Sequence, residues 1–230
     1  MTGIEELQRK VVQCRKCPRL VKWRERVARE KTRRFEHEEY WGRPNPSFGD
    51  PAARLLLIGL APAAHGGNRT GRMFTGDRSG DWLYRALHTF GFASQPTSVS
   101  RTDGLRLEDC YITATCRCAP PQNKLLPSEI RNCRPFLLTE LKLLGNVRVI
   151  VGLGKVGFDA AVNCLTTLGI ASFLKKPAFE HGAKYRVSEK LTLLASYHPS
   201  QQNTFTRRLT EPMFDSVFRT AKQLVNVWIS

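Results

Sequence analysis

Short apolar runs alternate with amphipathic segments along most of this chain. Four bounded apolar runs predict buried strands over residues 54–60, 109–115, 147–152 and 191–197. Apolar positions at helical spacing predict helices over residues 4–12, 19–31, 81–91, 127–144 and 154–168, and a last helix from an N-cap at Thr210 to Trp228. Pro135 is expected to kink or divide its helix. This alternation indicates a parallel sheet with helices on both faces.

The unusual sequences follow the predicted strands directly. They occupy residues 61–77, 116–123, 152–155 and 198–206. Because the carboxyl ends of parallel strands share one edge of a sheet, and ligands bind there, we expect these loops to meet around an active site. The stretch 59–77 contains five glycines together with Phe74 and Asp77, so its backbone can approach a ligand closely. Residues 35–50 predict an ordered loop, and residues 173–186 predict an irregular segment with room for a small hairpin or an edge strand.

The charge of the chain narrows the class of partner. The 230 residues carry a net charge of +16, and residues 9–34 alone contain twelve Lys or Arg against two Glu. Such a field attracts polyanions, so nucleic acid is the expected partner. The length is typical of one domain, and we expect a single domain over residues 1–230. The alternative for the basic run is a solvated helix face. The first residues lack a secretory signal and the longest apolar stretch is too short to span a bilayer, so we expect a cytoplasmic protein without membrane contact. No dimerisation stripe is visible, and we expect a monomer.

Seven cysteines cannot form a complete set of disulfides, and metal or cluster binding explains them better. Cys14 and Cys17 form a CxxC pair, and Cys118 and Cys133 are separated by fourteen residues. Four thiolates can hold a four-iron cluster or a zinc ion, and the wide second spacing favours the cluster. Cys116 competes with Cys118 as the third ligand. The other two cysteines, Cys110 and Cys164, are expected to be buried apolar residues.

The chain resembles the uracil-DNA glycosylase superfamily, and most closely its fifth family, the type B enzymes. The resemblance is carried by the motifs Gly59-Leu60-Ala61-Pro62-Ala63, residues 66–80, Cys118-Ala119-Pro120-Pro121-Gln122-Asn123, Cys133-Arg134-Pro135-Phe136 and His198-Pro199-Ser200-Gln201-Gln202-Asn203. It implies a three-layer α/β/α sandwich with a central four-stranded parallel sheet. It also implies a four-iron four-sulfur cluster and the removal of uracil and other deaminated bases, such as hypoxanthine and xanthine, from DNA.

Base release requires a nucleotide flipped out of its stack and a stabilised leaving base. Phe74 is the candidate stacking platform, with Gly59 and Ala61 beside the base; the alternative for Phe74 is a core aromatic. His198 is the candidate donor to the base carbonyl, where negative charge develops in the transition state. The alternative is an imidazole satisfied within the core.

Water activation is expected from polar groups outside the first motif, because Leu60 and Ala61 are apolar there. Asp77 is the first candidate and Asn123 the second, for the base or the water; Asp77 is also a plausible N-cap. In the fourth family an Asn stands where this chain has Ala114, which predicts relaxed discrimination between bases. Phosphate contacts are expected from Ser200, Gln202, Asn203, Arg207 and Lys155. No lysine is needed as a nucleophile, so we expect a monofunctional enzyme; the alternatives are a non-enzymatic iron–sulfur or zinc nucleic-acid binder and a redox protein.

Overall fold

The computed structural model describes residues 2–227, so the predicted burial of Trp228 lies outside the described residues. Within them the main helices are α1 (Gly3–Val12), α2 (Pro18–Glu30), α4 (Arg78–Thr89), α5 (Pro127–Leu143), α6 (Gly154–Thr167) and α8 (Glu211–Asn226). The short helices are η1 (Arg33–Phe35), α3 (Gly67–Thr70), η2 (Pro121–Asn123) and α7 (Gln201–Phe205). The strands are β1 (Phe48–Gly49), β2 (Leu55–Gly59), β3 (Cys110–Ala114), β4 (Val149–Leu153), β5 (Lys184–Arg186) and β6 (Thr192–Ser196).

The strands form one sheet in the order β1-β3-β2-β4-β6-β5. The inner four are parallel to one another, as predicted, and the two short outer strands are antiparallel to their neighbours. The prediction of a four-stranded parallel sheet is therefore confirmed for its centre, and the structure adds an antiparallel strand at each edge. β5 is the edge strand for which residues 173–186 left room.

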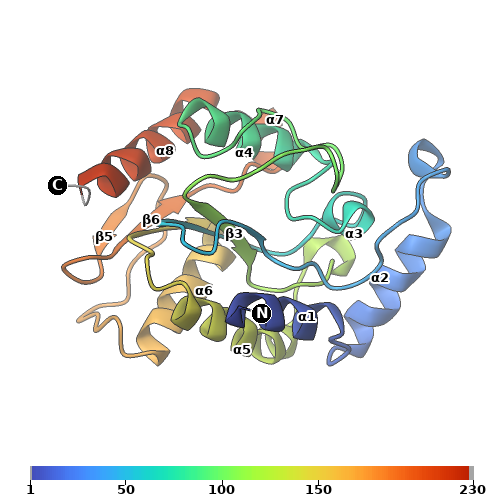
Figure 1. Ribbon diagram of the computed structural model, residues 1–230, viewed down its shortest axis with the longest axis horizontal. Coiled ribbons are helices and arrows are strands. Elements are labelled where there is room, and N and C mark those ends of the chain that lie inside the picture. Colours follow the sequence, from blue (N-terminus) through green and yellow to red (C-terminus); the bar gives the residue numbers. More distant parts are fainter. Residues whose placement is uncertain (1, 228–230) are drawn as a thin grey trace.

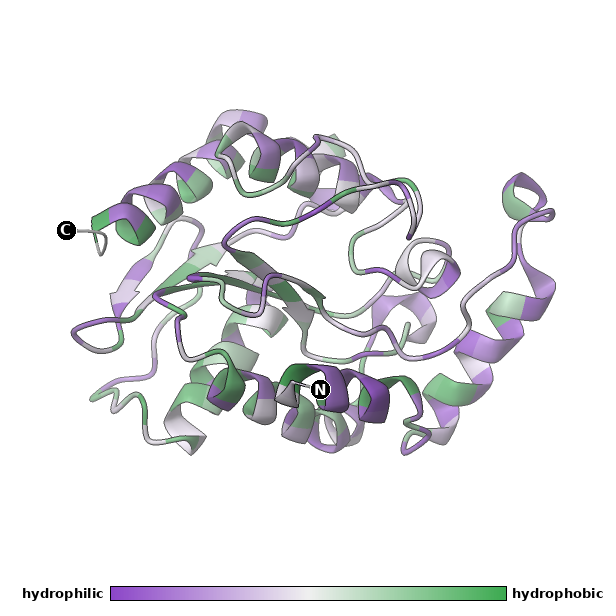
Figure 2. Ribbon diagram, viewed as in Figure 1, coloured by the Kyte–Doolittle hydropathy of each residue, from purple (hydrophilic) through white to green (hydrophobic). Residues whose placement is uncertain are grey.

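Helices cover both faces of the sheet, which gives the expected α/β/α sandwich (Figure 1). Leu55 and Leu57 of β2 face the layer of α4 and α8, whereas Leu56 and Ile58 face α5 and α6. Both sets are buried completely. This explains why the central strands are continuous apolar runs rather than alternating ones. Figure 2 shows the hydrophobic colour concentrated in these strands and on the sides of the helices that face them.

α5 departs from the sequence-based expectation. Pro135 lies inside it, yet the helix runs unbroken from Pro127 to Leu143, so the expected division is wrong. Packing of Leu137 into the core and the buried side chain of Glu140 hold the segment in place. Burial of this kind can offset the hydrogen bond that a proline removes. Within residues 2–227 no helix is long and apolar enough to cross a membrane.

Candidate active site

Phe74 lies directly over the end of strand β2. Its backbone has φ 51°, a left-handed conformation that is uncommon for a bulky residue and marks local strain. A Cβ added to Gly59 would stand 3.0 Å from Cζ and 3.1 Å from Cε2 of the Phe74 ring. Glycine at position 59 therefore lets the ring rest on the strand end, where a larger residue would displace it.

His198 follows β6 and brings a second ring to the same place. The Phe74 and His198 ring centroids are 5.8 Å apart, and their planes differ by 29°. Gly154, at the end of β4, has φ 79°, and a Cβ there would stand 3.1 Å from Cβ of His198. The loops after β2, β4 and β6 thus meet, as the sequence predicted, and two of the expected site residues are stacked.

The imidazole of His198 is free to bind a ligand. It is half-buried, and neither ring nitrogen makes a hydrogen bond to another residue in the range 2–227. Burial lowers the pKa of His198 to about 4, so the ring is neutral at physiological pH. A neutral imidazole presents one N–H donor and one acceptor nitrogen. This is the polarity needed to donate a hydrogen bond to a base carbonyl without adding a positive charge.

The backbone beside His198 is held by Asn203. The Asn203 side-chain amide donates to the carbonyl oxygen of His198 at 2.8 Å, and Ser200 accepts a hydrogen bond from the Asn203 backbone as N-cap of α7. Ser200 and Asn203, two of the five residues expected to contact phosphates, thus make hydrogen bonds within their own loop. Asn203 positions His198, a role that sequence reasoning missed.

Asp77 has the capping role that was the alternative to catalysis. It is the N-cap of α4 and accepts a hydrogen bond from the Gly80 backbone at 3.0 Å through Oδ1. Burial raises the pKa of Asp77 above its ordinary value, with the hydrogen bonds at the helix start opposing that shift. Gly80 itself admits no side chain, because a Cβ there would stand 1.8 Å from the carbonyl oxygen of Phe74. Asp77 and Phe74 therefore belong to one compact turn.

Asn123 lies apart from these contacts. It is exposed at the end of η2, with φ 56°, and within the described residues no hydrogen bond or ring contact joins it to Phe74 or His198. Ala61 is half-buried after β2. Lys155 is exposed and paired with Asp159 at 2.6 Å. Gln202 and Arg207 are exposed.

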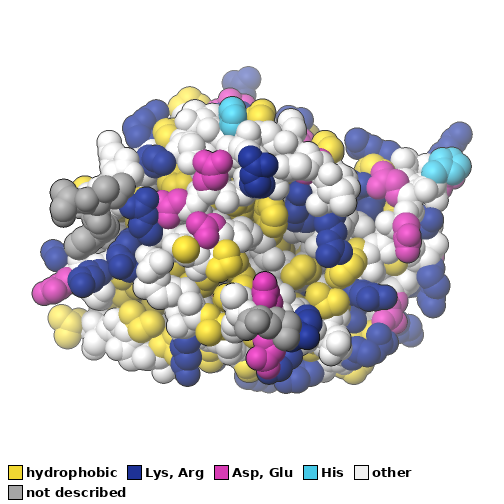
Figure 3. Space-filling model, viewed as in Figure 1, with side chains coloured by type: hydrophobic (Ala, Val, Ile, Leu, Met, Phe, Trp, Pro, Cys, Tyr) yellow, Lys and Arg dark blue, Asp and Glu magenta, His cyan; other side chains and the backbone are white. Residues whose placement is uncertain are grey.

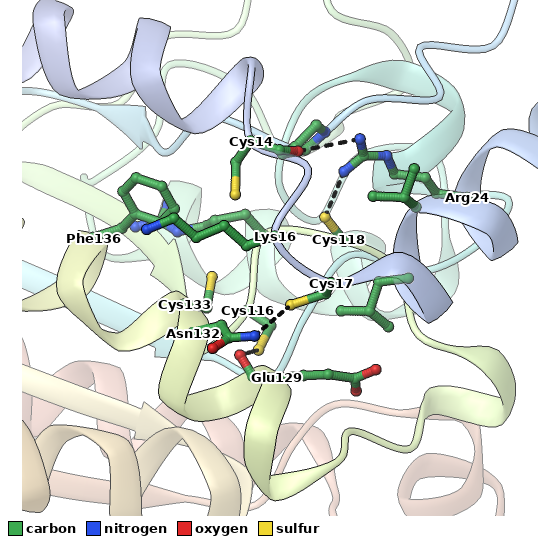
Figure 4. A pocket seen from close by; sticks show the side chains of 14 residues that line it. Cys14, Lys16, Cys17, Arg24, Cys116, Cys118, Glu129, Asn132, Cys133 and Phe136 are labelled. Carbon is green, nitrogen blue, oxygen red and sulfur yellow. Dashed lines mark hydrogen bonds between the residues drawn. The ribbon is translucent and has the colours of Figure 1, made fainter.

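Five cysteines from three segments of the chain surround one pocket, which the loop after β3 also lines (Figure 4). They are Cys14, Cys17, Cys116, Cys118 and Cys133. Within residues 2–227 no three Cys, His, Asp or Glu side chains come close enough together to hold one metal ion. The pocket therefore brings five thiols together, but the described side chains are too far apart to bind a single metal ion.

The polar neighbours of these thiols differ. The buried Arg24 donates to Sγ of Cys118 at 2.8 Å and to the carbonyl of Cys14 at 3.3 Å. Cys116 is buried, its thiol donates to the carbonyl of Glu129 at 3.6 Å, and its contact with Cys133 lowers the pKa of Cys133. Cys118, in contrast, is partly open to the pocket. As expected, Cys110 and Cys164 are buried away from it.

The loop that carries Cys116 and Cys118 is anchored through the residue between them. Arg117 is buried, and its guanidinium donates to Glu140 of α5 and to Ser47. Glu140 also accepts from Thr113 of β3 at 2.6 Å. This buried network fixes the cysteine loop to both the sheet and a helix.

Similarity to known proteins shows which family the chain belongs to. A family model described as the Uracil DNA glycosylase superfamily matches residues 46–222. This chain belongs to the uracil-DNA glycosylase superfamily. The region matched by the superfamily contains all four loops at the sheet edge, whereas Cys14, Cys17 and helix α2 precede it.

Several relatives are similar over almost the whole chain. A "Type-5 uracil-DNA glycosylase" of Mycobacterium tuberculosis is 51% identical over 226 residues, which cover 98% of this chain and 83% of the relative. One of Thermus thermophilus is 52% identical over 217 residues, which cover 93% of this chain and 94% of the relative. A "Type-4 uracil-DNA glycosylase" of Archaeoglobus fulgidus is 26% identical over 205 residues, 87% of this chain and 83% of the relative. The match to the Mycobacterium tuberculosis relative covers 98% of this chain and so extends over the N-terminal cysteine pair and α2.

Proposed function

We propose that this protein is a uracil-DNA glycosylase of the fifth family, which hydrolyses the N-glycosidic bond of a base flipped out of DNA. The observation that carries the proposal is the stacking of Phe74 on the imidazole of His198 at the carboxyl edge of the sheet. Within residues 2–227 the nitrogens of this imidazole make no hydrogen bond to another residue. The names of the Type-5 relatives support the placement in the fifth family. The designation type B is in none of those names and stays a prediction.

The two rings account for base binding and departure. Flipping a nucleotide out of the duplex costs a few kcal/mol, and stacking on Phe74 recovers part of that cost. As the glycosidic bond breaks, negative charge develops on the base, and an N–H of His198 stabilises it more strongly than in the ground state. Loss of one such donor lowers rates by about 10²–10³ in other enzymes.

Asp77 orients the attacking water or offsets the positive charge on the sugar. One of its oxygens accepts from Gly80, which leaves the second oxygen for this purpose. Asn123 remains the second candidate for contact with the base or the water.

The enzyme acts by hydrolysis alone, without cleaving the strand. Cleavage would require an amine to attack the sugar. Lys155 is the single lysine in the four loops at the sheet edge, and Asp159 pairs with it. The site thus offers no free lysine nucleophile from these loops.

The enzyme also accepts deaminated bases other than uracil, including hypoxanthine and xanthine. Ala114 stands at the end of β3, in register with Gly59, and is buried beside the strand on which Phe74 rests. A methyl group at this position cannot select between bases by hydrogen bonding, as the asparagine of the fourth family is expected to do. A wider range of substrates follows.

The thiol pocket holds a structural four-iron four-sulfur cluster. Cys14, Cys17, Cys118 and Cys133 are the proposed ligands, and all four are partly open to the pocket. A four-iron cluster keeps its thiolates further apart than a zinc ion does, so the loose arrangement of these sulfurs supports the cluster over zinc. The cluster would tie the segment before α2 to the loop after β3.

The proposal is tested with a duplex oligonucleotide that contains a single uracil. We expect the purified protein to release uracil and leave an intact abasic strand, and His198→Ala to slow release by about 10²–10³ under single-turnover conditions. Duplexes with hypoxanthine or xanthine measure the range of substrates. DNA binding without release of any base would instead support a non-enzymatic nucleic-acid binder.

A further inference from the structure

A tryptophan is fixed on the outer side of the active-site loop. The Trp41 backbone N–H donates to the carbonyl of Arg69 at 2.8 Å, and its indole N–H donates to the carbonyl of Pro44 at 3.1 Å. Gly71 has φ 76°, and a Cβ there would stand 2.9 Å from the indole. Gly71 precedes Phe74 by three residues in the same loop, so the Trp41 ring is attached rigidly to the segment that carries the stacking platform.

Two arginines lie over this one indole. The guanidinium carbon of Arg101 is 4.5 Å from the centroid of the Trp41 ring, and that of Arg43 is 5.6 Å away. Both arginines are exposed, and within residues 2–227 neither makes an ion pair or a side-chain hydrogen bond. Two positive charges at one ring repel each other unless an anion lies between or beside them.

Two arginines of the neighbouring loop are, by contrast, paired with carboxylates. Arg69 is paired with Glu38, and Arg72 with Asp103 at 2.7 Å. The Arg72–Asp103 pair also fixes the backbone next to Arg101, since Arg72 donates to the carbonyl of Arg101 at 3.5 Å. The two unpaired guanidiniums are thus held on a rigid base while their charges remain available.

We infer that Arg43 and Arg101, placed by Trp41, form a clamp for a backbone phosphate of the DNA strand that flanks the flipped nucleotide. Arginine forks suit phosphate oxygens, and the indole restricts the freedom of both side chains before binding. Lys and Arg are frequent on the neighbouring lobe: Figure 3 shows them on α2 and η1, with several Asp and Glu among them. Arg69 joins this lobe to Trp41, since its guanidinium carbon is 3.9 Å from the centroid of the Phe35 ring of η1 and its carbonyl accepts from Trp41. The inference rests on the proposed function only for the choice of DNA as partner.

The test measures equilibrium binding to an undamaged duplex across a salt series, without base release. Loss of the contact to this one phosphate in Arg43→Gln/Arg101→Gln should lower the slope of log K against log[salt] by about 0.9. The affinity deficit of this variant should then shrink about 3.5-fold between 50 and 200 mM salt. A matched control removes the same charge at the opposite edge of the sheet, in Lys184→Gln/Lys190→Gln, and should leave the slope unchanged. Both control lysines are exposed.

A charge-conserving variant separates a phosphate contact from a change of shape. Arg43→Lys/Arg101→Lys keeps two cations and should retain most of the slope, and the thermal midpoint should show that all variants are folded. An unchanged slope in the glutamine pair, or an equal fall in the control, would overturn the clamp. If the wild-type protein itself bound DNA without salt dependence, the proposed function would fail rather than the clamp alone.

Discussion

The carboxylate of Asp77 packs directly against the backbone of Gly66: a Cβ on residue 66 would stand 2.0 Å from Oδ2 of Asp77. The other oxygen accepts from the Gly80 backbone. The side chain is therefore held from two sides, by a helix start and by the loop that leads from β2. Such fixation suits a group that must orient water, because its geometry is set before the substrate arrives.

Replacement of Asp77 distinguishes its capping role from its proposed catalytic role. Asn is as good an N-cap as Asp, so Asp77→Asn should keep the thermal stability of the protein while slowing base release by about 10²-fold or more. Asp77→Ala should lose the same activity and about 1 kcal/mol of stability. Single-turnover rates and thermal unfolding of both variants provide the measurement.

Gly66→Ala is the companion variant for Asp77. The added methyl must displace the carboxylate, so we expect a fall in base release although no polar group has been removed. A fully active Asp77→Asn, with Gly66→Ala impaired, would assign Asp77 to capping alone and move the search for the water-orienting group to Asn123.

The half-buried side chain of His198 predicts how the rate of base release and the stability of the protein depend on pH. Because its pKa is lowered to about 4 from the ordinary 6.5, its donor state should not change between pH 6.5 and 8, and the His198 contribution to the rate should be constant there. The unfolded chain takes up the proton first as pH falls, so stability is lost through the window from about 6.5 down to 4. The ring is partly exposed, and we expect a loss of about 1–2 kcal/mol.

His198→Gln provides the control for this pH effect. Its thermal midpoint should fall less than that of the wild type between pH 6.5 and 4, because glutamine does not titrate. Equal falls in the two proteins would mean that His198 has an ordinary pKa in the folded state.

The central strands and the position of the site could be predicted because both depend on local sequence. Buried parallel strands must be continuous apolar runs, and the loops after them must meet at one edge. The edge strand β1 could not be predicted, since two half-buried residues leave no apolar pattern, and β5 was predicted only as an open alternative within residues 173–186. α5 was misjudged because proline propensity outweighed tertiary packing in the prediction.

The partners of the site residues were also beyond sequence reasoning. Arg24 lies in a run of basic residues that suggests a solvated helix face, yet it is buried against Cys118. Its burial depends on a loop almost a hundred residues away, which no local pattern shows. The ion pair of Lys155 with Asp159, one helical turn further on, was likewise not part of the prediction.

Cysteine variants test the cluster and the choice of its third ligand. Cys118→Ser should abolish the broad visible absorption near about 400 nm that is expected of iron–sulfur clusters, whereas Cys116→Ser should retain it, because Cys116 is buried and bonded to the backbone of Glu129. Loss of colour in the Cys116 variant alone would exchange the two assignments. A colourless wild type with one zinc per chain would reject the cluster.

Arg24→Gln should make the cluster harder to reduce. The Arg24 guanidinium donates to Sγ of Cys118 at 2.8 Å and so stabilises added negative charge. Hydrogen bonds and charges at ligand sulfurs tune cluster potentials, and loss of this one should shift the midpoint potential to a more negative value. A spectroscopic redox titration measures the shift, with Arg15→Gln as a control, since Arg15 pairs with Glu25 on the surface. An unchanged potential would show that Arg24 stabilises only the fold.

Asn203→Ala tests whether Asn203 positions His198 or contacts DNA. The Asn203 side chain donates to the His198 carbonyl at 2.8 Å, so its loss should let the imidazole move and slow base release, by less than His198→Ala does. If Asn203 only positions His198, the affinity for DNA should not change, whereas loss of a phosphate contact would weaken binding. Asn203→Asp is a matched variant that keeps size but removes the donor, and it should slow base release as the alanine does. A normal rate together with weaker DNA binding would return Asn203 to the phosphate-binding role that its motif first suggested.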